Sequence, residues 1–220
     1  MWSILTDPLP DVISVNGVTF EVFTDFRVWL RAGQLLSGAG REIKQETLSR
    51  LFDLVVPAEG RPKGYILGAD FIEAVSVFYA GPQKDEEKDT DAPEPNRPRP
   101  QRTFDFAYDA AFVYQSFASF YGIRLCEVRM HWWEFLELFS GLMLSDGNSL
   151  NFVMGVRQKK MSDVPKRQRA AYGKMKKAFA LPKDRNVKKA ENAVYDMLEA
   201  MWAENDKQRE EESNGGQSDH

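Results

Sequence analysis

The chain has 220 residues and a formal net charge of −4, with 43% hydrophobic and 12% aromatic residues. This is enough apolar material for one core, or two small ones, and the single cysteine, Cys126, excludes an internal disulfide. No run approaches the roughly 20 apolar residues that span a bilayer, and the first residues lack the features of a secretory signal, so we expect a cytosolic protein.

The N-terminal part, residues 1–81, predicts a short β-hairpin followed by helices. Asn16-Gly17 stands between two β-branched runs, which is the strongest short hairpin signal because both central residues of the tight turn need a positive φ. Apolar residues at helical spacing then predict three helices, at about 25–36 with Thr24 as N-cap, 41–55 and 69–81. An isolated hairpin is marginal in water, so we expect it to lie against these helices.

The next segment, residues 82–102, has a different composition. It holds five prolines and eleven charged residues, and it has no aromatic or large aliphatic residue. Such a segment buries too little apolar area to offset the entropy lost on ordering. We predict a disordered linker that divides the chain.

Residues 103–182 predict an aromatic-rich helical core. One helix is indicated over 103–121, with Gly122 suited to the position after its end, and another over 130–142. A basic helix follows and ends before Pro182, and residues 183–220 predict a C-terminal helix with an acidic, disordered tail. The predicted fold class is therefore mainly α, resembling a helical bundle, with a short N-terminal hairpin.

Side chains that commonly carry catalysis are scarce. The two histidines are His131 and His220, too few for a metal site without the tail, and Cys126 has no neighbouring base. Asp105 and Asp109 stand four residues apart at a helix start, where carboxylates serve as caps. No glycine-rich phosphate loop occurs. We therefore predict a protein that is not an enzyme and that uses no metal and no cofactor.

A basic segment runs from Arg157 to Lys189, with thirteen Lys and Arg residues against two acidic ones. Such a segment could neutralise phosphates and bind nucleic acid without sequence preference. Tyr172, Met175 and Phe179 nevertheless give this helix one inward face, and no nucleic-acid-binding motif accompanies it. The favoured interpretation is a solvated cationic face that meets an acidic partner or the acidic tail of the chain.

The consecutive residues Trp132 and Trp133 raise a separate question. Side chains of neighbouring helical residues point about 100° apart. Trp132 belongs to the apolar stripe of its helix, whereas Trp133 falls beside Glu137 and Ser140 at the edge of the polar side. Either a second helix covers this edge, or Trp133 is an exposed anchor for another protein.

Four ordered blocks resemble a known family: ILTDPLPDVISVNGVTFEVFTDFRVWLR, FDFAYDAAFVYQSFASFYGIRL, MHWWEFLELFSGL and YGKMKKAFALP. They resemble the bacteriophage family named "gene product fifteen", of tailed siphophages and prophages of mainly Gram-positive bacteria. The resemblance covers most of residues 1–182. It implies a tail assembly chaperone, typically encoded between the major tail protein and the tape measure protein.

The resemblance and the residues together predict a non-enzymatic chaperone that binds the tape measure protein during tail morphogenesis. Further expected partners are the tail tube protein, a second tail chaperone or another copy of the chain, with no membrane. We expect it in the host bacterial cytoplasm and not in the mature virion. The alternatives are a nucleic-acid-binding accessory protein that uses residues 157–189, and a minor structural tail protein. The predicted partner-binding residues are Trp133, Glu137, Lys166, Arg167, Arg169, Lys176 and Lys177.

Overall fold

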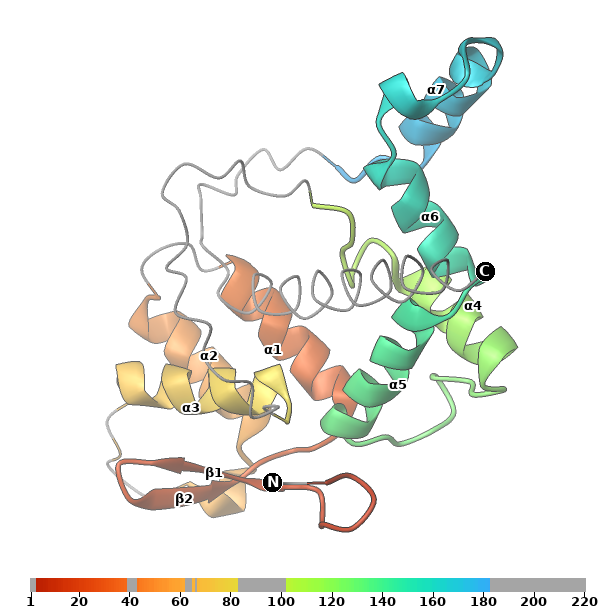
Figure 1. Ribbon diagram of the computed structural model, residues 1–220. Helices are drawn as coiled ribbons and strands as arrows, with labels where there is room; N and C mark the ends of the chain where they lie inside the picture. The colour runs from red at the N-terminus through yellow and green to blue at the C-terminus, as the bar shows by residue number, and fades with distance from the viewer. Residues whose placement is uncertain (1–2, 39–42, 62–64, 66, 83–101, 183–220) are drawn as a thin grey trace, which may run out of the picture. The chain divides into compact units, whose positions relative to one another are not determined.

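The computed structural model describes residues 3–38, 43–61, 65, 67–82 and 102–182 (Figure 1). Within this part of the chain there are seven α-helices and one two-stranded antiparallel sheet, so the predicted mainly α fold with an N-terminal hairpin is confirmed. The predicted linker, apart from its end residues Pro82 and Arg102, and the predicted C-terminal helix and tail from residue 183 onward lie outside the described residues.

The chain forms two compact units that are interleaved in sequence. The N-terminal unit comprises the described residues 3–82 together with 129–140, and the C-terminal unit comprises 102–128 and 141–182. The N-terminal unit is therefore completed by a segment that follows part of the C-terminal unit in the chain.

The hairpin consists of β1 (Val12–Val15) and β2 (Val18–Glu21), joined by the predicted turn. Asn16 has φ 51° and Gly17 has φ 80°, as a tight two-residue turn requires. Phe20 and the inward residues of β1 are buried against the helices of the unit, as expected for a hairpin too small to be stable alone.

Four helices build the rest of the N-terminal unit: α1 (Phe26–Gly38), α2 (Gln45–Val55), α3 (Ala69–Ala80) and the first part of α5 (Trp132–Leu144). A short 3₁₀ turn, η1 (Ala58–Gly60), follows α2. Stacked aromatic rings form the core: the centroids of Trp29 and Phe78 are 4.3 Å apart, and those of Phe26 and Phe135 are 4.8 Å apart. The predicted N-cap Thr24 is wrong by one residue, because the carboxylate of Asp25 accepts the hydrogen bond from the Arg27 N–H at 3.0 Å.

The indole N–H groups of the two neighbouring tryptophans donate hydrogen bonds to carbonyls at the end of α3. The indole N–H of Trp132 donates to the carbonyl of Tyr79, and that of Trp133 donates to the carbonyl of Phe78, both at 2.8 Å. The last carbonyls of a helix lack the usual partner one turn further along the chain. The Trp132 bond gives the Tyr79 carbonyl a partner, and the Trp133 bond adds to the one that the Phe78 carbonyl accepts from the Gly81 N–H at 3.2 Å. Trp132 is fully buried and Trp133 is half-buried.

The C-terminal unit contains α4 (Ala110–Phe120), the end of α5, α6 (Ser149–Gln158), α7 (Arg169–Ala178) and two 3₁₀ turns, η2 (Met161–Asp163) and η3 (Lys166–Gln168). The helix α4 begins later than the sequence predicted. The Asp105 carboxylate accepts hydrogen bonds from the N–H groups of Ala107 and Tyr108, which holds the preceding residues in a turn. Gly122 has φ 70° and follows the helix end as predicted.

A buried ion pair joins α4 to α6. The guanidinium of Arg157 donates to both carboxylate oxygens of Asp109 at 2.7 Å, and it also bonds the carbonyls of Thr103 and Phe179. Asp109 is 0% exposed and Arg157 is 4% exposed. Two expectations are corrected here: the Asp109 side chain does not cap α4, and Arg157 does not belong to the cationic surface.

Candidate functional site

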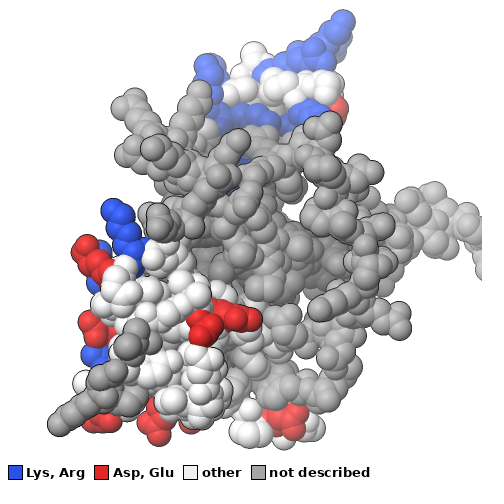
Figure 2. All heavy atoms as spheres, turned by 90° about the vertical axis from the view of Figure 1, so that its left-hand side faces the viewer, with Lys and Arg blue, Asp and Glu red and all other residues white. Residues whose placement is uncertain are grey.

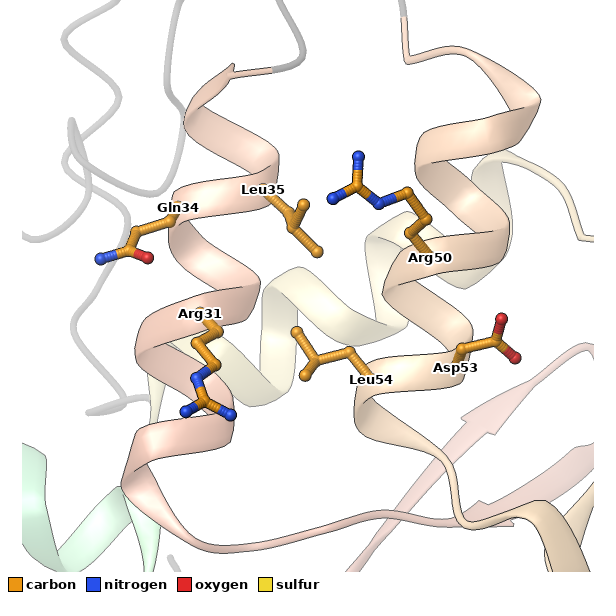
Figure 3. Close-up of a pocket in the computed structure, with 6 residues that line it drawn as sticks. All are labelled: Arg31, Gln34, Leu35, Arg50, Asp53 and Leu54. Atoms are coloured by element: carbon orange, nitrogen blue, oxygen red, sulfur yellow. The ribbon is translucent and has the colours of Figure 1, made fainter.

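An open groove lies between α1 and α2 of the N-terminal unit, with a volume of about 560 Å³. Figure 3 shows Leu35 of α1 and Leu54 of α2 directed into the space between these helices. Both leucines are half-buried, and the exposed Arg50 extends toward the same space from α2. The groove is also lined by Arg31, Gln34 and Asp53. It thus has an apolar floor and a polar rim.

The rim of this groove carries two arginines that form no ion pair with another described residue. Within the described residues, neither Arg31 nor Arg50 forms an ion pair, and the nearby Asp53 is already paired with Arg61. An exposed guanidinium can bind a carboxylate through two parallel hydrogen bonds. Apolar side chains between such groups match the face of an amphipathic helix that carries acidic residues beside its apolar stripe. The groove can therefore hold an acidic helical segment.

A second groove, of about 460 Å³, lies between β1 and α3 and is bounded by Trp133. Its apolar lining includes Val12 and Val77, which are 40% and 57% exposed. Its charged lining residues are Asp70 and Glu73. The N-terminal unit therefore presents one cationic groove and one anionic groove.

The structure separates the predicted partner-binding residues into two sets. Trp133 and Glu137 belong to the N-terminal unit, and the five basic residues belong to the C-terminal unit. The ring of Trp133 packs on Phe78 of α3, with centroids 5.6 Å apart, and its N–H is already bonded there. Glu137 is exposed on α5. Trp133 thus has a structural role, and contact with a partner stays a prediction for both residues.

The basic set is largely exposed. Figure 2 shows Lys and Arg side chains gathered over the surface that η3 and α7 form. Lys166, Arg167 and Lys177 are exposed and Lys176 is half-buried. Arg169 is held differently, because its guanidinium donates to the carbonyls of Val164 and Ser162 at 3.0 and 3.2 Å. The set forms a cationic face in which Arg169 mainly braces the loop that precedes α7.

The inward face of α7 agrees with its sequence pattern. The Tyr172 hydroxyl donates to the Val156 carbonyl at 3.2 Å, and the Phe179 ring meets those of Phe112 and Phe152. Tyr172 and Phe179 are half-buried, as is Met175 between them. The cationic face is therefore mounted on a helix that packs against its own unit.

His131 ties the start of α5 to the segment that precedes β1. Its Nδ1 accepts the backbone N–H of Trp133 at 3.0 Å, so the proton lies on Nε2, which donates to the Pro10 carbonyl at 2.8 Å. Burial lowers the pKa of His131, and the Pro10 carbonyl and the carboxylates of Glu134 and Asp11 oppose this shift.

Within the described residues, no group of three or more His, Cys, Asp or Glu side chains is arranged to hold a metal ion.

These features define a helical protein with open grooves of a size that suits segments of other polypeptides. The family described as Bacteriophage Gp15 protein matches residues 5–181. The match covers most of the sequence, so the chain belongs to this bacteriophage family. No curated protein and no solved structure matches it.

No helix in the described part of the chain is long and apolar enough to cross a membrane.

The sequence did not single out either groove. Arg31 and Arg50 come from different helices, and nothing local to either residue indicates that α1 and α2 bring them to one groove. One signal was present at Arg31, which has no acidic residue three or four positions away, whereas Arg50 has Glu46 and Asp53 at such positions. An arginine without such a neighbour is a candidate for contact with a partner.

Proposed function

We propose that the protein is a tail assembly chaperone that binds the tape measure protein during tail morphogenesis and acts by binding, without catalysis. Membership of the bacteriophage Gp15 family makes the chain a phage protein. The observation that carries the chaperone role is the α1–α2 groove, which has an apolar floor between two arginines that lack ion-pair partners within the described residues.

The groove suits the partner on physical grounds. A tape measure protein is long and helical, and its apolar stripes need cover until the tail tube surrounds them. Leu35 and Leu54 offer an apolar surface to such a stripe, and Arg31 and Arg50 can bind acidic residues on either side of it. The charges around the groove also keep the free chaperone soluble.

Co-expression with the tape measure protein of the same phage tests this role. We expect the two proteins to copurify at moderate salt, and we expect the double variant Arg31→Glu, Arg50→Glu to abolish copurification. The matched control is Lys44→Glu, Arg129→Glu, which makes the same change in charge at exposed positions of the same unit outside the groove. Failure of the unaltered chain to copurify would contradict the proposal.

The cellular location follows from the same proposal. A chaperone leaves when the tube subunits replace it, so we expect the protein in the host cytoplasm during assembly and not in purified virions. Mass spectrometry of virions measures this directly. Stoichiometric recovery of the protein from virions would instead favour a minor structural tail protein.

A nucleic-acid-binding accessory role is the second candidate, because the cationic face of η3 and α7 is exposed. In this case binding to duplex DNA would weaken steeply as salt rises, since each neutralised phosphate releases counterions. Reversal of Lys166 and Arg167 to glutamate would then abolish DNA binding and leave capture of the tape measure protein unchanged.

A further inference from the structure

The outer edge of β1 carries backbone groups that the hairpin does not use. Opposed residues of an antiparallel pair alternate between hydrogen-bonded and non-hydrogen-bonded positions. The pair that closes the two-residue turn, Val15 and Val18, is hydrogen-bonded, so Ile13 also points its backbone groups toward β2. The backbone N–H and C=O groups of Val12 and Ser14 therefore point away from β2. Within the described residues, the N–H and C=O groups of these two residues have no backbone partner.

This edge faces the groove of about 460 Å³ between β1 and α3. The groove is lined by residues 10–16 and by one face of α3, while no residue of β2 lines it. The α3 residues recur at helical spacing: Asp70, Glu73, Ala74, Val77 and Phe78. In Figure 1, β1 is the strand of the hairpin that lies nearer α3. The groove therefore has a strand edge on one side and a half-apolar helix face on the other.

The charge of the groove is negative. Glu73 is exposed and has no ion-pair partner within the described residues, and the Asp70 carboxylate accepts one hydrogen bond from the Asn16 side chain at 2.6 Å. Among the residues that the structure describes, no Lys or Arg lines the groove. A cationic side chain is the complement of this surface.

The walls of the groove are held at both ends. The bond between Asn16 and Asp70 ties the hairpin turn to the start of α3. At the other end, the Trp133 indole is bonded to the Phe78 carbonyl, and the His131 ring is bonded to the Pro10 carbonyl, both at 2.8 Å. A site whose walls are already fixed does not have to be ordered when a ligand binds, so less free energy is lost.

We propose that this groove binds an extended segment of another polypeptide as an additional strand on β1. The segment pairs with the backbone of Val12 and Ser14, places Lys or Arg opposite Glu73, and lays alternate apolar side chains against Val77 and Trp133. Strand addition of this kind takes affinity from backbone hydrogen bonds and specificity from side-chain pockets. A second copy of the hairpin is a poor occupant, because the strands VISV and VTFE carry no cation.

The inference concerns a different groove from the one under the proposed function and does not depend on the tape measure protein. Its test is selection of random ten-residue displayed peptides on the full-length chain, followed by fluorescence anisotropy with the enriched peptides. We expect enriched sequences that combine alternating β-branched residues with Lys or Arg.

Two variants remove the proposed contacts. Ser14→Pro deletes the outward N–H without removing a hydrogen bond of the hairpin, and proline is tolerated on edge strands. Its control is Thr19→Pro, the opposed position on β2, whose outward N–H points away from the groove. Glu73→Lys reverses the charge at that position and offsets the charge of Asp70, with Glu46→Lys on the exposed surface of α2 as control.

Affinity should fall about tenfold in Ser14→Pro and in Glu73→Lys, and should change less than about twofold in the controls. Circular dichroism establishes whether each variant is folded. If Ser14→Pro is not folded, the peptide affinity of Glu73→Lys alone decides whether the inference holds. The inference is overturned if no peptide is enriched, or if peptide affinity is unchanged in Glu73→Lys or in folded Ser14→Pro. Loss of peptide binding with intact capture of the tape measure protein separates this inference from the proposed function.

Discussion

Arg157 and Asp109 form a fully buried pair in which the guanidinium makes four hydrogen bonds. Removal of one partner leaves the other charge buried without compensation, which costs about 3–5 kcal/mol. We expect this loss in the free energy of unfolding for Arg157→Met and for Asp109→Leu, measured by urea denaturation. The double variant should be less destabilised than the sum of the two single ones, because it buries no unpaired charge. Additive losses would contradict the pairing.

The sequence could not reveal this pair. Its composition assigns Arg157 to a basic segment, and charge along a chain does not tell which cation is buried. The same limit applies to Trp133. The sequence placed Trp133 correctly at the edge of the helical stripe. It could not indicate that the indole N–H donates to a carbonyl at the end of α3, because that helix is distant in the sequence.

His131 gives the N-terminal unit a pH dependence of known sign. Burial lowers its pKa in the folded protein below the value of about 6.5 for the unfolded chain, and protonation of Nδ1 would break the bond from the Trp133 N–H. The unfolded chain therefore binds this proton at higher pH than the folded protein does. This contribution to stability is complete above pH 6.5 and is lost as the pH falls toward the lower, folded pKa.

The matched variant is His131→Asn, whose side-chain oxygen can accept the same N–H but does not titrate in this range. We expect the free energy of unfolding of the unaltered protein to fall between pH 7 and pH 5 by more than that of the variant. Urea denaturation at several pH values measures the difference, and parallel curves would contradict the assignment.

At the scale of helices and strands, we expect alanine substitution to have opposite effects on stability at two glycines. A Cβ at Gly33 of α1 would overlap the ring of the buried Tyr79 on α3, whereas a Cβ at Gly155 of α6 would meet nothing within 4 Å. We expect Gly33→Ala to destabilise the protein by about 1–3 kcal/mol, the usual cost of overpacking. Gly155→Ala should stabilise it by about 0.5–1 kcal/mol, because alanine favours the helix.

Thermal unfolding followed by circular dichroism distinguishes the two glycine variants. The melting temperature should fall for Gly33→Ala and rise for Gly155→Ala. If Gly33→Ala were neutral, α1 and α3 would not approach one another as closely as the structure shows.

Most elements were predictable from local pattern. The turn of the hairpin and the positions of α1, α2, α3 and α5 follow from Asn16-Gly17 and from apolar spacing. The start of α4 was placed too early because Asp105 binds backbone N–H groups in a turn, which competes with the helix. The helix α6 was not singled out, although Asn148 caps it by accepting the Asn151 N–H at 2.8 Å.

At the scale of the whole molecule, the interleaving of the two units was not predictable, because contacts between distant segments have no local signature. Residues 129–140 supply Trp132, Phe135 and Phe139, all fully buried, to the N-terminal unit. We therefore expect residues 1–83 alone to show no cooperative thermal transition. Residues 1–83 joined to 129–144 through a flexible linker should show one, and a cooperative transition in the shorter fragment would contradict the division.

The order of the segments also has a consequence for synthesis on the ribosome. The last residue of the N-terminal unit that precedes the C-terminal unit is 83, and the segment that completes it ends at 140, which is 57 residues later. Translation at about 10 residues per second takes roughly 6 seconds to cover that interval. During this time Trp29 and Phe78 of the nascent chain lack the cover that Trp132 and Phe135 give them in the folded protein. The rate of translation therefore sets how long these apolar side chains can cause aggregation.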